Sequence, residues 1–146
     1  MIHVRHSAVA DIPVDRAFTY IDDYRHVPDW MFGVTRFDPV GEQLSGLGAR
    51  YDTTMRVGPK NLDARVEVVE WEHNRTIVLE AIAGFCTASS WTFTDLGDAT
   101  RLDVDFGYRL PGGIAGRTLG MLIEPIVGTA IRQTEQALRT RLGQLV

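Results

Sequence analysis

Few side chains in this sequence have the type and spacing that metal binding or nucleophilic catalysis requires. The four histidines, His3, His6, His26 and His73, fall on an expected strand, a loop and a turn, and no cysteine or carboxylate spacing completes a ligand set around them. Cys86 is the single cysteine, and nothing beside it in the sequence would activate it as a nucleophile. We therefore expect no metal site, no internal disulfide and no cysteine nucleophile.

The glycines near the C-terminus do not form a phosphate-binding loop. The stretch from Gly112 to Gly116 follows an expected strand but lacks the βαβ context and the later acidic residue of a dinucleotide-binding motif. The sequence thus implies no cofactor. Gly112, Gly116 and Gly120 recur every four residues and Gly128 follows, which fits either a mobile lid with space for a ligand or close helix packing.

Glu124 is the only carboxylate in the apolar half of the last expected helix. A buried acid at this position would have a pKa suited to proton transfer. The helical wheel, however, places Glu124 at the edge of the apolar stripe beside Arg117 and Gly128, which favours a solvated or ion-paired carboxylate.

Aromatic and hydroxyl side chains alternate along the expected strands in a pattern that would line a pocket. Each aromatic alone is better explained as core, and only the group indicates a pocket. Hydroxyls on the inward parity need a partner, which a ligand, a water or the backbone can supply. Trp30 follows a helix break, where it caps a ligand or fills space between small helices. The candidate ligand-binding residues are Trp30, Tyr51, Thr53, Met55, Phe85, Ser89, Trp91, Phe93, Phe106 and Tyr108, with Leu119, Ile123, Ile126 and Val127 from the last helix.

The elements that would position these residues change type along the chain. Alternation predicts a first strand over residues 2–10, and the turn at residues 11–15 starts a helix with Ala17, Phe18 and Ile21 on its apolar face. This helix is expected to stop near Asp23, with a short second turn of helix at residues 29–31 after Pro28.

From Gly33 the hydrophobic period changes to two, and regularly spaced turn signals leave room for six more strands. Their connections are too short for crossover helices, so consecutive strands must pair as antiparallel hairpins. The alternation slips between Val68 and Trp71, which indicates a β-bulge. After residue 113 the pattern is helical to the end, with one apolar stripe facing the sheet. The predicted class is α+β, with helices on one face of a curved sheet.

Composition excludes several partners. The chain has 146 residues, of which 45% are hydrophobic. We therefore expect one domain over residues 1–146 that buries a hydrophobic core without needing disulfides or a bound metal. The formal charge of −4 provides no basic face for nucleic acid. The longest apolar stretch is too short to span a bilayer, and the N-terminus lacks the apolar run of a secretory signal, so we expect a cytoplasmic protein.

Three segments carry a family resemblance. They are residues 10–18 (ADIPVDRAF), residues 21–30 (IDDYRHVPDW) and residues 68–72 (VVEWE), the last followed by a strand start at residues 100–102. In this order they resemble the START-type, birch-pollen-allergen-like helix-grip superfamily (SRPBCC), and within it the bacterial polyketide cyclase/dehydrase and lipid-transport branch. The resemblance implies a helix-grip fold, in which a curved seven-stranded antiparallel sheet surrounds a long C-terminal helix and two short helices follow the first strand.

The resemblance leaves three functions open, because members of the superfamily range from lipid and quinone binders to cyclases and ribosome-directed toxins. The first is binding of a small hydrophobic or aromatic molecule (a lipid, polyketide or quinone) between the sheet and the last helix. The second is a polyketide cyclase/dehydratase that moves protons through Tyr108, a pocket water or Glu124. The third is a ribosome- or protein-directed interaction module that uses Met121 and Pro125. A homodimer is compatible with all three.

Overall fold

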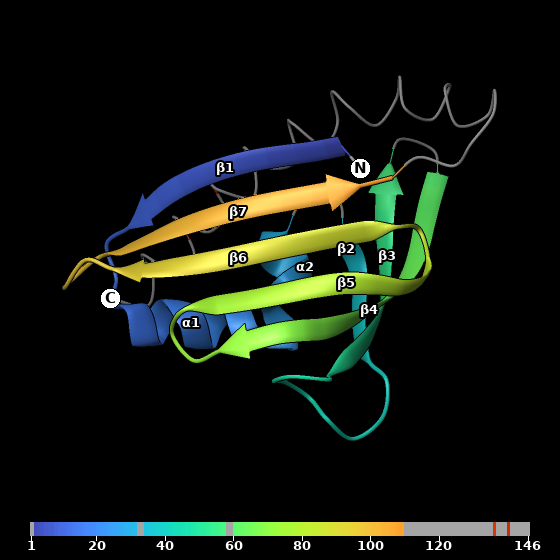
Figure 1. Ribbon diagram of the computed structural model, residues 1–146, viewed down its shortest axis with the longest axis horizontal. Coiled ribbons are helices and arrows are strands. Elements are labelled where there is room, and N and C mark those ends of the chain that lie inside the picture. Colours follow the sequence, from blue (N-terminus) through green and yellow to red (C-terminus); the bar gives the residue numbers. More distant parts are fainter. Residues whose placement is uncertain (1, 32–33, 58–59, 110–135, 137–139, 141–146) are drawn as a thin grey trace.

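A curved antiparallel sheet with short helices on one face makes up the computed structural model, which describes residues 2–31, 34–57, 60–109, 136 and 140 (Figure 1). The helical segments are α1 (Val14–Asp22), the 3-10 turn η1 (Tyr24–His26) and α2 (Val27–Trp30). The strands are β1 (Ile2–Ala10), β2 (Val34–Pro39), β3 (Arg50–Val57), β4 (Lys60–Glu72), β5 (Thr76–Gly84), β6 (Thr87–Asp95) and β7 (Thr100–Tyr108).

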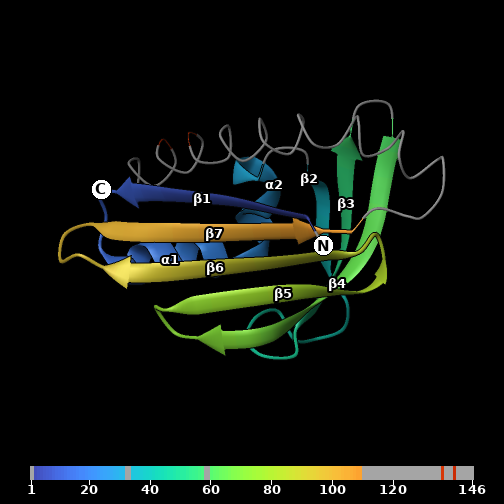
Figure 2. The ribbon, with the colours of Figure 1, turned by 45° about the horizontal axis from the view of Figure 1, so that its top comes forward.

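The seven strands follow the order β1-β7-β6-β5-β4-β3-β2. Strands β2 to β7 form successive hairpins, and β1 joins the far edge by pairing with β7, with Val4 opposite Phe106. Figure 1 shows β2 and β3 running steeply across the direction of β1 and β7, so the sheet is strongly bent. We call the face that carries α1 and α2 the inner face and the opposite one the outer face (Figure 2).

Two irregularities in the pairing of β4 with β5 accompany the bend. The register shifts between Arg65 and Val66 and again between Val68 and Glu70, and an extra residue in one strand increases local twist. The second shift allows Val68 and Trp71 both to pack on the inner face although they are three positions apart. The bulge predicted from the broken alternation is therefore confirmed.

Helix α1 is held on the inner face by its apolar side. Ala17, Phe18 and Ile21 are buried, and the Phe18 ring packs edge-on against Trp71 and Phe93, with centroid distances of 5.5 and 5.1 Å. Burial of such a side chain contributes about 1.5–3 kcal/mol. The position of α1 is thus set by contacts with β4 and β6.

A buried hydrogen bond ties the start of α1 to the last described strand. The hydroxyl of Thr100 donates to the carbonyl oxygen of Ile12 at 2.8 Å, and both residues are fully buried. Loss of this donor would leave a buried carbonyl without its partner, which costs about 1–3 kcal/mol.

The first strand, the helix that stops before Asp23, and the six later strands agree with the sequence predictions. One strand boundary was wrong: Phe85 was expected on the face of the sixth strand, but β6 begins at Thr87. Gly84 adopts a φ of +79° at the end of β5, and the N–H of Phe85 donates to the Asp63 carbonyl, so the chain turns there. The predicted C-terminal helix lies outside the described residues, and none of the described helices has the length and apolarity to cross a bilayer.

Gly84 and Gly97 provide a matched test of this turn. Both have positive φ, but a Cβ on Gly84 would overlap the carbonyl oxygen of Asp63, whereas one on Gly97 would meet no heavy atom within 4 Å. We expect Gly84→Ala to lower the free energy of unfolding by about 1–3 kcal/mol more than Gly97→Ala, because only the former adds a clash to the backbone strain. Urea unfolding of the two variants measures the difference, and equal losses would contradict this account of the turn.

Candidate functional site

The inner face contains an apolar cavity of about 40 Å³ between the helices and the sheet. Helical segments supply one wall and five strands, β2 to β6, supply the other. The lining residues are Ile21, Asp22, Tyr24, Val27, Met31, Phe37, Tyr51, Val68, Ile77, Leu79 and Trp91. A concave, mostly aromatic and aliphatic lining with few polar groups is typical of sites for small hydrophobic molecules.

Two of the residues predicted from the sequence line this cavity, Tyr51 and Trp91, and both are buried. The Tyr51 ring stacks on Phe37 with a centroid distance of 4.6 Å, and its hydroxyl donates to the Leu44 carbonyl at 2.6 Å. The phenol is therefore held by the backbone of the β2–β3 connection and presents its ring to the cavity.

Other predicted residues share the inner face without lining this cavity. Phe93 packs on Phe18, Tyr108 is fully buried beside Phe106, and Ser89 is 8% exposed. The remaining two lie on β3: Met55 is half-buried against the core, and the hydroxyl of Thr53 donates to the Ala64 carbonyl at 3.2 Å. For Thr53 the backbone supplies the partner that its inward position requires.

The rest of the predicted set cannot be placed in the cavity. Phe85 lies in the turn before β6. Trp30 ends α2, but its side chain lies outside the described part of the structure. Outside the described residues altogether are Leu119, Ile123, Glu124, Ile126 and Val127.

Asp22 is the polar lining residue with a perturbed pKa that sequence reasoning missed. It follows the buried Ile21 at the end of α1, and its Oδ1 accepts a hydrogen bond from Nε1 of Trp71 at 3.0 Å. An inward tryptophan needs an acceptor for its N–H, which was the available signal. The acceptor stands 49 positions away in the chain, so periodicity alone could not identify it.

Burial controls the electrostatics around Asp22. It raises the pKa of the Asp22 carboxyl; the hydrogen bond from Trp71 opposes this shift, neighbouring Asp23 adds to it, and His73 opposes it. Burial likewise raises the pKa of Tyr51 to about 12, with Asp22 among the negative groups that contribute. At neutral pH the Tyr51 phenol is therefore a hydrogen-bond donor, and burial disfavours the ionised form of Asp22.

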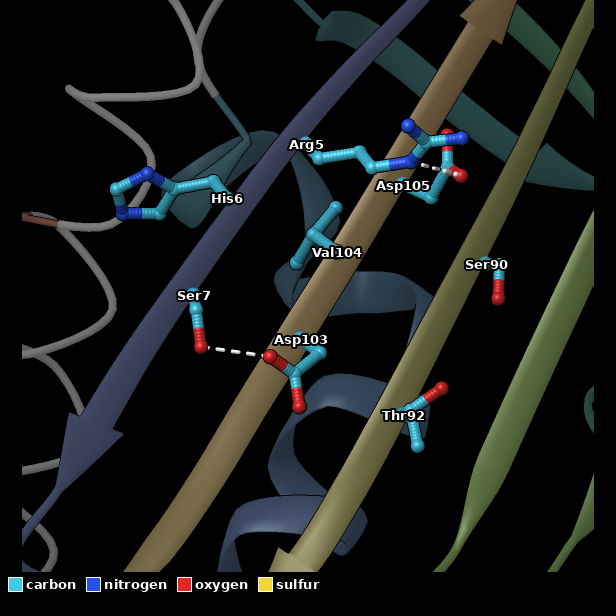
Figure 3. A pocket seen from close by; sticks show the side chains of 8 residues that line it. All are labelled: Arg5, His6, Ser7, Ser90, Thr92, Asp103, Val104 and Asp105. Atoms are coloured by element: carbon cyan, nitrogen blue, oxygen red, sulfur yellow. Dashed lines mark hydrogen bonds and ion pairs between the residues drawn. The ribbon is translucent and has the colours of Figure 1, made fainter.

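The outer face contains a different kind of hollow, a depression of about 300 Å³ over β1, β7 and β6 (Figure 3). Four of its charged and polar side chains bond in pairs: Arg5 donates to Asp105 at 3.1 Å and Ser7 to Asp103 at 2.6 Å. Exposed pairs of this kind contribute about 0–1 kcal/mol each. No group of three potential ligands for a metal ion occurs among the described residues.

Comparison with known proteins identifies one matching family. The family described as "Polyketide cyclase / dehydrase and lipid transport" matches residues 1–143. No curated protein matches the sequence.

Several solved structures share the fold. A protein from Thermus thermophilus is similar with a TM-score of 0.83 at 19% identity, over 99% of both chains. A START superfamily protein from Mycobacterium smegmatis follows with a TM-score of 0.75 at 18% identity, again over 99% of both chains. The Zhui aromatase/cyclase from a Streptomyces species has a TM-score of 0.73 at 15% identity, over 98% of this chain and 94% of that one.

Asp22→Asn tests the electrostatic account. Asparagine keeps an acceptor oxygen for Trp71 but removes the charge that burial disfavours. Because the folded pKa of Asp22 lies above its unfolded value, ionisation of this group destabilises the fold at neutral pH and protonation relieves the penalty as pH falls. We expect the variant to unfold at higher urea concentration than wild type at pH 7, by a margin that shrinks as pH falls through the carboxyl titration.

The matched control is Asp38→Asn, which removes an exposed carboxylate from β2 and should change stability little at either pH. A lower stability of Asp22→Asn at pH 7 would show that the ionised carboxylate is favourable where it lies.

Proposed function

Because this chain belongs to the polyketide cyclase/dehydrase and lipid-transport family, we propose that it binds a small hydrophobic or aromatic molecule, of the lipid, polyketide or quinone type, on the inner face of the sheet. The observation that carries the proposal is the apolar cavity between the helices and β2 to β6. The proposed pocket extends to Leu119, Ile123, Ile126 and Val127, whose sequence pattern predicts the apolar stripe of the last helix.

The cavity as it stands accommodates only part of such a molecule, so binding requires its walls to move. Met31 and Leu79 are half-buried lining residues, and an unbranched methionine adapts readily to the shape of a ligand. Burial of apolar ligand surface would supply affinity at about 25 cal/mol per Å². Ser89 is the inner-face hydroxyl that we propose orients a polar end of the ligand.

A second candidate is a reaction of the polyketide cyclase/dehydratase type. The observation that favours it is Asp22, a carboxyl that lines the cavity and has a raised pKa, as expected of a group that exchanges protons with a bound substrate. Met121 and Pro125, on which the protein-directed alternative depends, lie outside the described residues, so no structural observation favours that alternative.

Native mass spectrometry of protein purified without denaturation is the first test. We expect a stoichiometric hydrophobic adduct that is released by organic solvent, since an apolar pocket retains its ligand when nothing competes for it. Identification of the extract names the chemical class. Protein that carries no adduct and also fails to bind the probes below would contradict the proposal.

A pair of phenylalanine substitutions on β5 tests the location of the pocket. Leu79 lines the cavity, whereas Ile82 is exposed. With 2-naphthol and palmitate as probes, we expect Leu79→Phe to weaken binding by about tenfold or more because the ring occupies the cavity, and Ile82→Phe to leave it unchanged. Calorimetric titration measures the affinities and thermal unfolding verifies the fold. Equal affinity of the two variants would place the ligand elsewhere.

A further inference from the structure

A third hollow lies at the end of α1, between η1, the β2–β3 connection and the turn that joins β4 to β5. It is a groove of about 450 Å³. Asp22 and Tyr24 line both this groove and the apolar cavity, so they form a wall that the two hollows share. The groove is thus adjacent to the proposed hydrophobic site but is built from different side chains.

The two carboxylates of the groove differ in their partners. Asp23 is neutralised by Arg25, whose Nε and Nη2 donate to the two carboxylate oxygens at 3.0 and 2.7 Å. Asp22 has no arginine or lysine partner among the described residues and accepts its hydrogen bond from Trp71 at Oδ1. The groove is thus lined by two carboxylates, one guanidinium and the His73 imidazole, and the guanidinium is already engaged by Asp23.

Aromatic rings share the groove with the Asp22 carboxylate. Phe18, Tyr24 and Trp71 all line the groove, and the indole is held in place by its bond to Asp22 and by edge contact with Phe18 at 5.5 Å. An aromatic face attracts a cation through the ring quadrupole. A carboxylate in a groove lined by aromatic side chains therefore favours a positive group that carries an apolar body.

The opposite wall of the groove is preformed. In the β2–β3 connection the Gln43 side chain donates to the carbonyls of Ser45 and Leu47 at 3.0 and 2.7 Å, and the Tyr51 hydroxyl donates to that of Leu44. Leu44 and Ser45 of this braced segment line the groove. A site whose walls are already held loses less entropy when a ligand binds.

We propose that this groove binds an organic amine, with its ammonium group at Asp22 and its apolar body against Trp71 and Phe18. Other ligand classes fit less well. An anion would find Arg25 already engaged by Asp23, a neutral molecule would leave Asp22 uncompensated, and the described residues offer no three-ligand set for a metal ion. The proposal does not require the apolar cavity to be occupied.

The test compares 2-phenylethylamine with its neutral analogue 2-phenylethanol by calorimetric titration at neutral pH. Wild-type protein is expected to bind the amine about tenfold or more tightly than the alcohol. Asp22→Asn should abolish this preference, and Asp38→Asn, which makes the same change in net charge at an exposed site on β2, should retain it. No preference in wild type, its survival in Asp22→Asn, or its loss in Asp38→Asn would overturn the proposal.

Leu79→Phe distinguishes binding in the groove from binding in the cavity, because Leu79 lines the cavity and not the groove. We expect this variant to lose the hydrophobic probes and to bind the amine as wild type does. If its affinity for the amine falls in parallel, the amine occupies the cavity and the groove assignment is wrong. If wild-type protein binds the amine but neither hydrophobic probe, the proposed cavity site is contradicted and the proposed amine site is not. Thermal unfolding of each variant verifies that a lost interaction is not lost folding.

Discussion

The Phe18 ring packs edge-on against Trp71, Phe93 and His73, and the position of the whole helical layer follows from these contacts. Helix α1 has nine residues, too few to be stable in isolation, so its geometry must come from tertiary packing. With Phe18 seated, Ile21 is buried and Asp22 meets the indole of Trp71. Both the apolar cavity and the groove are bounded by residues that this docking puts in place.

Local pattern was sufficient to predict much of the fold. Alternation identified the strands, the positions of Ala17, Phe18 and Ile21 identified the buried side of α1, and the slip before Trp71 identified the bulge in β4. Contacts between distant segments were not predictable in this way. The hydrogen bond from Trp71 to Asp22 joins residues 49 positions apart. A helical wheel describes only residues within one helix, so it does not predict that Asp22 accepts a hydrogen bond from a strand.

The misplaced strand start at Phe85 has a backbone origin. The alternation pattern uses only the order of apolar and polar side chains and assumes an extended backbone throughout. The positive φ of Gly84 instead ends β5 and turns the chain, and strand pairing resumes at Thr87. The same limit applies to the candidate site: Tyr51 and Trp91 were found because they alternate inward, and Asp22 and Tyr24 were missed because a helix end supplies them.

Pairing of β1 with β7 imposes an order of events on the chain as it is made. Ile2 lies opposite Tyr108 and Ala10 opposite Thr100, so β1 is synthesised well before β7, the strand with which it pairs in the described sheet. Contacts of such sequence separation fold slowly because a long loop must close before they form. Until β7 has been synthesised, the nine residues of β1 lack this pairing. Strands with unpaired edges tend to aggregate or to require a chaperone.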